Sequence, residues 1–251
     1  MTGKNCVIGI ASTAATVVLT ACGAAKIEAW KPVANADSML AAGDTVIGGF
    51  RIRPPRNFSP VPKPQRLPIK TEWVGGGEPP VWFVKSGEEA TADTWEDPNQ
   101  VRVIQGTCPI YMGSNEMVRC ETEAVPRQFR ISVRKTSYPN SDEHLETLAI
   151  HELDSMRQSP DVEDYERTPV EFGTINGVKF ARTSWTAKIP VQKRMPSVQM
   201  NVPSPAQGYS YATITAGQVV QMTGLTPKGD GWYKAIEQAA LTFSPGTHTT
   251  R

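Results

Sequence analysis

The spacing of apolar and polar residues along the chain predicts short strands over most of its length and two helices in its second half. Alternating apolar and polar positions, which are typical of a half-buried strand, first occur at residues 45–53. Two prolines at 54 and 55 end this run, because proline cannot donate to a sheet ladder. Further strands are expected at 69–74, 81–84, 101–105, 117–122 and 128–134.

Two stretches change to helical spacing. Residues 141–158 place their large apolar side chains on one helical face, with Ser141 as the N-cap. Residues 232–243 repeat apolar side chains at the same spacing after a Gly-Asp-Gly turn. This second pattern predicts a terminal amphipathic helix that covers the sheet.

The dipeptide Asn176-Gly177 lies between two alternating runs and is the strongest hairpin signal in the chain. A second hairpin is expected from residues 209–215 and 219–223. Between these elements, the acidic segment 159–169 and the polar, proline-containing segment 192–207 are expected to be loops.

The composition narrows the possible fold class and the possible partners. A chain of 251 residues is long enough for one domain with extra segments, and its 21 prolines and 20 glycines favour a β-rich fold over a helical bundle. The formal charge of +1 comes without a basic stripe interleaved with aromatic residues. Nucleic acid is therefore not expected as a partner.

The N-terminus has the features of an export signal. Lys4 precedes an apolar stretch, residues 6–19, which is too short to span a bilayer as a helix. Leu19-Thr20-Ala21-Cys22 then closes the segment as a lipobox, which resembles type II signal peptides of bacterial lipoproteins. The resemblance implies lipid on Cys22, cleavage before it, and an extracytoplasmic protein anchored to the cell membrane or outer membrane. An ordinary signal peptide or a buried apolar helix remains the alternative.

Only Cys108 and Cys120 would remain in the mature domain. Two cysteines in an oxidising compartment predict one disulfide, and the turn-forming residues between them suit a hairpin or a looped excursion. Metal binding by this pair is disfavoured, because no further ligands at zinc-site spacing lie near.

The order of these elements resembles the PsbP-like fold, which includes bacterial lipoproteins of the DcrB type. The residues that carry the likeness are the Gly-Phe-Arg-Ile-Arg-Pro-Pro run at 49–55, Ile175 to Val178, Trp185, Tyr211, and Ala239 to Phe243. The resemblance implies an α+β fold, an antiparallel sheet flanked by helices in an α/β/α sandwich, with a role in binding or assembly. We expect a signal peptide at 1–21, a tether at 22–45, one globular domain at 46–245 and a polar tail at 246–251.

Catalytic motifs are incomplete in this sequence. His151-Glu152 begins like the zinc-protease helix motif, but Ser155 stands where the second histidine is required, and His144 lies two turns away. A metal-dependent hydrolase using His144, His151 and Glu152 is therefore an alternative without a complete motif. Ser132 and Lys135 match a Ser-x-x-Lys pattern, but an offset of three on a strand places them on opposite faces.

The hypothesis that follows is a lipid-anchored module without a catalytic site, cofactor or metal, which binds an unknown envelope protein or a small ligand. Trp82 precedes Phe83, so one of these two side chains must face away from the core if the segment is a strand. Trp82 is therefore the candidate partner contact. A carrier of a small apolar ligand is a further alternative, which a deep uncharged cavity would favour.

Overall fold

The computed structural model describes residues 27–60, 80–86, 103–112, 116–195 and 198–246. Its helices are η1 (Ala36–Ser38), α1 (Asp142–Arg157) and α2 (Trp232–Ala240). Its strands are β1 (Glu28–Ala29), β2 (Thr45–Ile47), β3 (Phe50–Ile52), β4 (Phe58–Pro60), β5 (Val81–Lys85), β6 (Val103–Met112), β7 (Glu116–Ala124), β8 (Gln128–Lys135), β9 (Glu163–Arg167), β10 (Glu171–Ile175), β11 (Val178–Met195), β12 (Val198–Thr215), β13 (Gln218–Pro227) and β14 (Ser244–Pro245).

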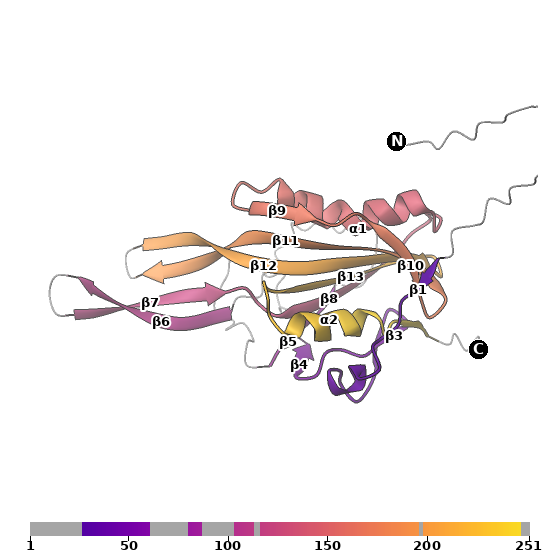
Figure 1. Cartoon of the computed structure of the whole chain (residues 1–251), viewed down its shortest axis with the longest axis horizontal. Coiled ribbons are helices and arrows are strands. Elements are labelled where there is room, and N and C mark those ends of the chain that lie inside the picture. The colour runs from indigo at the N-terminus through magenta and orange to yellow at the C-terminus, as the bar shows by residue number, and fades with distance from the viewer. Residues whose placement is uncertain (1–26, 61–79, 87–102, 113–115, 196–197, 247–251) are drawn as a thin grey trace, which may run out of the picture.

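A large mixed sheet forms most of the structure (Figure 1). Its strands follow the order β1-β10-β11-β12-β13-β8-β5-β4, with β7 and β9 also paired to β11 and with β6 paired to β7. The pair β1 and β10 is parallel, and the other neighbours in this order are antiparallel. A separate three-stranded sheet has the order β14-β3-β2.

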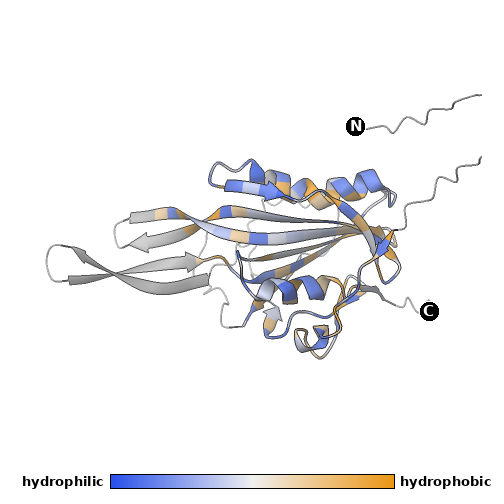
Figure 2. Ribbon diagram, in the orientation of Figure 1, coloured by the Kyte–Doolittle hydropathy of each residue, from blue (hydrophilic) through white to orange (hydrophobic). Residues whose placement is uncertain are grey.

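The helices α1 and α2 pack on opposite faces of the large sheet. Successive residues of a strand point to opposite faces, and on β12 Tyr211 packs in the cluster that contains α2, whereas Ala212 packs against Leu145 and Ala149 of α1. Figure 2 shows apolar and polar residues on both helices, as expected for helices that bury one face. The prediction is confirmed in its coarse form, as a large and mostly antiparallel sheet with helices packed on it. The finer prediction of an α/β/α sandwich is not confirmed, because strands dominate the structure.

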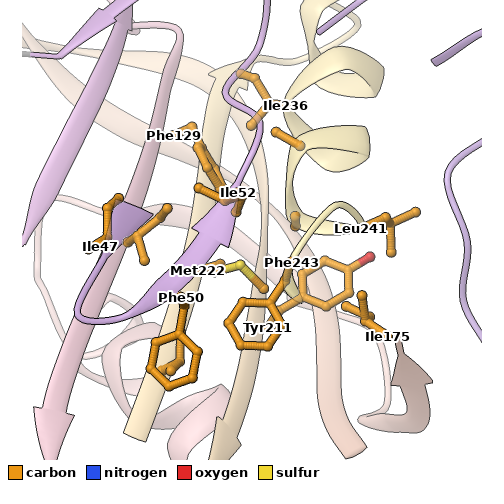
Figure 3. Packing of buried hydrophobic residues seen from close by; sticks show 14 of the residues in the cluster. Ile47, Phe50, Ile52, Phe129, Ile175, Tyr211, Met222, Ile236, Leu241 and Phe243 are labelled. Carbon is orange, nitrogen blue, oxygen red and sulfur yellow. The ribbon is translucent and has the colours of Figure 1, made fainter. Parts of the chain in front are cut away.

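The main core lies between the large sheet, α2 and the small sheet (Figure 3). Phe50 of the small sheet packs against Phe243, with ring centroids 5.2 Å apart. Tyr211 and Met222 contribute from β12 and β13. The small sheet therefore closes the part of this face that the short α2 leaves uncovered.

Several local predictions are confirmed. Helix α1 begins after Ser141, whose hydroxyl accepts a hydrogen bond from the His144 backbone N–H at 3.4 Å. The turn between β10 and β11 has positive φ angles at Asn176 and Gly177 (48° and 80°), as a tight hairpin requires. Helix α2 forms at the predicted place and buries Ile236 and Ala239.

Two segments expected to be loops are strands. The acidic segment 159–169 contains β9, which pairs with β11. The polar segment 192–207 lies within the long hairpin of β11 and β12, whose register extends to Met195 opposite Val198. Its prolines are tolerated because β13 pairs with β12 only from Ala206 onward, and a strand without a neighbour on one side needs no donor there.

The folded structure begins before the expected boundary at residue 46. Trp30 and Leu40 are 5% and 1% exposed and belong to the main core, and the Trp30 backbone N–H donates to Thr174 at 2.8 Å. The segment from residue 27 onward is therefore part of the fold rather than a tether. Within the described part of the chain, no helix is long and apolar enough to cross a membrane.

Candidate functional site

A polar pocket of about 200 Å³ opens on the α2 face of the large sheet, between β10, β11, β12 and α2. We call it the tyrosine pocket. Its lining includes six side chains that bear on its chemistry, namely Glu171, Arg182, Tyr209, Tyr211, Tyr233 and Glu237.

The register of the three strands brings these groups together. Arg182 of β11 lies opposite Glu171 of β10 on one side and opposite Tyr211 of β12 on the other. Residues directly opposite one another in antiparallel strands point to the same face, and Tyr209 shares that face because it lies two positions from Tyr211. The strand positions alone therefore place an arginine, a carboxylate and two phenols side by side.

Arg182 is held by Glu171 and Trp30. Its Nε donates to Glu171 Oε2 at 2.8 Å, and a second guanidinium nitrogen lies 2.8 Å from the same oxygen. The guanidinium also lies 4.2 Å from the centroid of the Trp30 ring, which is a cation–π contact. Trp30 can lie this close to the sheet because Gly173 has no side chain: a Cβ there would meet the indole at 2.3 Å.

The aromatic rings contact one another edge to face. The Tyr209 ring lies 5.2 Å from Tyr211 and 6.1 Å from Tyr233, and the Trp30 ring lies 5.9 Å from Tyr211. The Tyr209 hydroxyl donates to the backbone carbonyl of Ile236. By contrast, neither the Tyr211 hydroxyl nor the Trp30 Nε1 has a hydrogen-bond partner in the described structure, although both atoms are buried.

Burial changes the ionisation of the pocket. It raises the pKa of Tyr209 and of Tyr211 well above the usual value, and it raises the pKa of Tyr233 to about 12. The nearby Glu237 carboxylate raises the pKa of all three tyrosines further. Burial also raises the pKa of Glu237, against the opposing charges of Arg182 and Lys234. The phenols are therefore neutral across the physiological range.

Tyr211 and Glu171 stabilise the charged form of Arg182. Burial acts to lower the pKa of Arg182, but its interactions with Tyr211 and Glu171 outweigh burial, and the pKa is raised. Arg182 therefore stays charged and is neutralised by Glu171. The carboxylate of Glu237 makes no hydrogen bond or ion pair to a described residue, so the described lining, when ionised, carries one net negative charge.

None of the candidate residues from the sequence is among the described residues that line the pocket. Cys22 is outside the described residues, and Trp82 lies on β5 with its side chain outside them. Cys108 of β6 and Cys120 of β7 are directly opposite one another in the hairpin register. The predicted hairpin is thus confirmed for the backbone, and the disulfide stays a prediction.

The histidines of the hydrolase hypothesis lie on α1, on the other face of the sheet. His144 Nδ1 is 2.7 Å from the Ser141 hydroxyl, and its ring stacks on Tyr138 with centroids 5.0 Å apart. His151 is exposed, and the Glu152 side chain is outside the described part. No group of three histidine, cysteine or carboxylate side chains suited to a metal occurs among the described residues.

No protein-family model matches the chain, and a search of curated proteins finds no match. The case for this site therefore rests on its own geometry. Sequence reasoning missed it, because Glu171, Arg182 and Glu237 come from three separate elements. The one local signal was the pair Tyr209 and Tyr211, two large polar aromatics on the same face of a strand, whose direct chain neighbours Gly208, Ser210 and Ala212 are small.

Proposed function

We propose that this protein is a lipid-anchored binding protein of the bacterial cell envelope, which holds a small polar ligand in the tyrosine pocket. The lipobox ending at Cys22 supports the lipid anchor and the location in the cell envelope. The pocket supports the binding role, since a concave aromatic surface with a few convergent polar groups is the usual form of a small-molecule site. As part of the same proposal, the domain is a variant of the PsbP-like sandwich, which the order of hairpin, sheet and terminal helix supports.

One observation carries the binding role, and it is the Tyr211 hydroxyl. The side chain is 1% exposed and lines the pocket, and its hydroxyl makes no hydrogen bond of normal geometry to a described residue, although the Arg182 guanidinium lies near enough to interact with it. A buried polar group without a partner costs about 1–3 kcal/mol. A ligand that bonds to this hydroxyl would recover that free energy.

The two alternatives receive less support. The lining of the tyrosine pocket is polar and charged, which does not favour a carrier of an apolar ligand. The hydrolase hypothesis would need His144, His151 and Glu152 to converge on one metal, and His144 is instead engaged with Ser141 and Tyr138.

The proposed lipid anchor is tested by measuring the intact mass of the protein purified from its native membranes. We expect a chain that begins at Cys22 with added acyl mass, and a Cys22→Ala variant that lacks this mass and leaves the membrane fraction. An unmodified, full-length chain in the soluble fraction would contradict the lipid anchor.

The binding role is tested by native mass spectrometry on the same preparation. We expect a bound small molecule whose occupancy falls in Tyr211→Phe, because the substitution removes only the hydroxyl. Tyr138→Phe, an exposed tyrosine outside the pocket, serves as the matched control. If the protein carries no ligand from its native membranes, and none is retained from a metabolite extract, the binding role is refuted.

A further inference from the structure

The charge balance of the tyrosine pocket specifies the chemistry of its ligand. Arg182 and Glu171 form an ion pair, with two guanidinium nitrogens near one carboxylate oxygen. Arg182 is also fixed from its other side by the Trp30 ring at 4.2 Å. Arg182 is the one strong cation among the described residues that line the pocket, and Glu171 already neutralises it, which makes the site a poor one for an anion.

Among the described residues that line the pocket, Glu237 is the carboxylate that makes no ion pair, although the charges of Arg182 and Lys234 act on it from a distance. It lies in the second turn of α2 and is partly buried. Its carboxylate has no ion pair in the described structure, although it is close enough to act on the phenols of Tyr209, Tyr211 and Tyr233. Burying a carboxylate without a partner is costly, and a cation in the pocket would offset that cost.

Two tyrosine hydroxyls of the pocket can act as further hydrogen-bond acceptors. The Tyr211 hydroxyl makes no hydrogen bond of normal geometry to a described residue, and the Tyr233 side chain lies in the lining next to Glu237 on the same helix. A primary ammonium group carries three N–H donors, whereas a quaternary ammonium carries none. The faces and edges of the three phenol rings also suit an organic cation, which is attracted by aromatic rings.

We propose that the tyrosine pocket binds the primary ammonium group of a small organic molecule, with Glu237 as the counter-charge and Tyr211 and Tyr233 as further acceptors. The inference rests on the proposed function and names the ligand class of the same site. A volume of about 200 Å³ is below the usual range of drug-sized pockets, so the site receives a head group of a few non-hydrogen atoms.

The test is a titration of the full chain with ethanolamine, followed by the indole N–H signals in NMR spectra. Trp30→Phe assigns the Trp30 signal. We expect ethanolamine to shift that signal, with a Kd no tighter than tens of micromolar for so small a ligand. Choline, which has the same hydroxyethyl arm but no N–H donor, should bind at least about tenfold more weakly.

Variants separate the role of the charge from that of the fold. Glu237→Gln keeps the shape and should weaken ethanolamine binding at least about tenfold, which is about 1.4 kcal/mol. Glu146→Gln, an exposed glutamate on α1 at the other face, should leave the Kd unchanged. Circular dichroism of Glu237→Gln establishes that the variant is folded. If the folded variant binds ethanolamine as wild type does, the proposed role of Glu237 is overturned.

An ethanolamine group can be part of a lipid or of a soluble molecule, and lipid vesicles distinguish these two sources. A shift of the Trp30 signal by phosphatidylethanolamine vesicles, but not by phosphatidylcholine vesicles, would place the ammonium on a lipid, and a shift by free ethanolamine alone would place it on a soluble molecule. If neither shifts the signal while native mass spectrometry still detects a bound molecule, the ligand class is wrong and the proposed function stands. If no bound molecule is found either, both are wrong.

Discussion

Glu237 shows how one residue links the pocket to the stability of the fold. Because its pKa is raised above the ordinary value near 4.5, the native state binds its proton more tightly than the unfolded state does. The free energy of unfolding therefore falls as pH rises from the ordinary pKa to the raised one. At neutral pH, the unliganded protein holds an ionised carboxylate at a cost that a ligand would remove.

Glu237→Gln should therefore stabilise the unliganded protein at pH 7, with a midpoint of thermal unfolding higher by about 2 °C or more. The gain should disappear below about pH 4, where the glutamate is protonated in both states. Thermal unfolding followed by circular dichroism at the two pH values checks this. Glu146→Gln is the control, and equal midpoints for Glu237→Gln and wild type at pH 7 would contradict a cost of burial at Glu237.

The same linkage predicts the pH dependence of ligand binding. The groups that act on Glu237 are Arg182 from β11, Lys234 from its own helix, and the phenols of the pocket, which stay neutral. Lowering the pH through the raised pKa of Glu237 removes the counter-charge, so the affinity for ethanolamine should fall. NMR titrations at pH 7 and pH 4 measure this loss, and an affinity that is unchanged at pH 4 would exclude Glu237 as the counter-charge.

At Gly173, the position of Trp30 beside the pocket requires a residue without a side chain. Any side chain there would push against the Trp30 indole, since a Cβ would lie 2.3 Å from the ring. We expect Gly173→Ala to displace Trp30 from Arg182 and to cost about 1–3 kcal/mol, as overpacking does. Urea unfolding measures the loss. Gly43→Ala, where a Cβ would meet nothing within 4 Å, should leave the free energy of unfolding nearly unchanged.

At the scale of elements, the start of α2 depends on Asp230. Its Oδ1 accepts from the Trp232 backbone N–H at 2.7 Å, and its Oδ2 lies 2.6 Å from a guanidinium nitrogen of Arg127. Both side chains of this ion pair are mostly buried, with 10% and 21% exposed. The carboxylate thus accepts from the first N–H of the helix that carries Tyr233 and Glu237, and connects this helix to the residues between β7 and β8.

Asp230→Ala should cost about 2–4 kcal/mol, because it removes a helix cap and leaves a buried guanidinium without this partner. The matched control is Asp37→Ala, which breaks the pair of Asp37 with Arg53. There Asp37 is 83% exposed, so the loss should stay below about 1 kcal/mol. Urea unfolding compares the two variants, and equal losses would show that Asp230 does not hold α2 in place.

The elements that could be predicted from sequence are those with a local cause. Helix α1 follows from its spacing and the Ser141 cap, and the turn of β10 and β11 follows from Asn176-Gly177. The distal half of the β11 and β12 hairpin could not be predicted, because its prolines are acceptable only where β13 has ended. The pocket could not be predicted either, because it depends on the register of separate strands and on where α2 lies.

At the scale of the whole molecule, the large sheet extends well beyond its helices (Figure 1). The hairpin of β6 and β7 joins the far part of β11, where Lys193 pairs with Thr122 and Arg194 with Glu121. The helices and the main core lie at the other end of the sheet. A covalent link between β6 and β7 would therefore strengthen a part of the molecule that is distant from the main core.

The register supplies the geometry for such a link. Residues directly opposite one another in antiparallel strands have Cα atoms about 4.5–5.5 Å apart, and disulfides join Cα atoms about 4.4–6.8 Å apart. Cys108 and Cys120 are opposite one another in this way. An oxidising compartment, as the lipobox predicts, would then favour a disulfide between them.

We expect the protein from native membranes to resist alkylation at Cys108 and Cys120 until a reductant is added. Closing a loop of this length contributes about 3 kcal/mol in the chain-entropy model, so reduction should lower the free energy of unfolding by about that amount. Peptide mapping after alkylation, with and without reductant, measures the first effect, and urea unfolding measures the second. Cys108→Ser is the control, because it should expose the Cys120 thiol without any reductant. If both thiols react in untreated protein, the hairpin depends on its backbone pairing alone, and the predicted disulfide and oxidising compartment are contradicted.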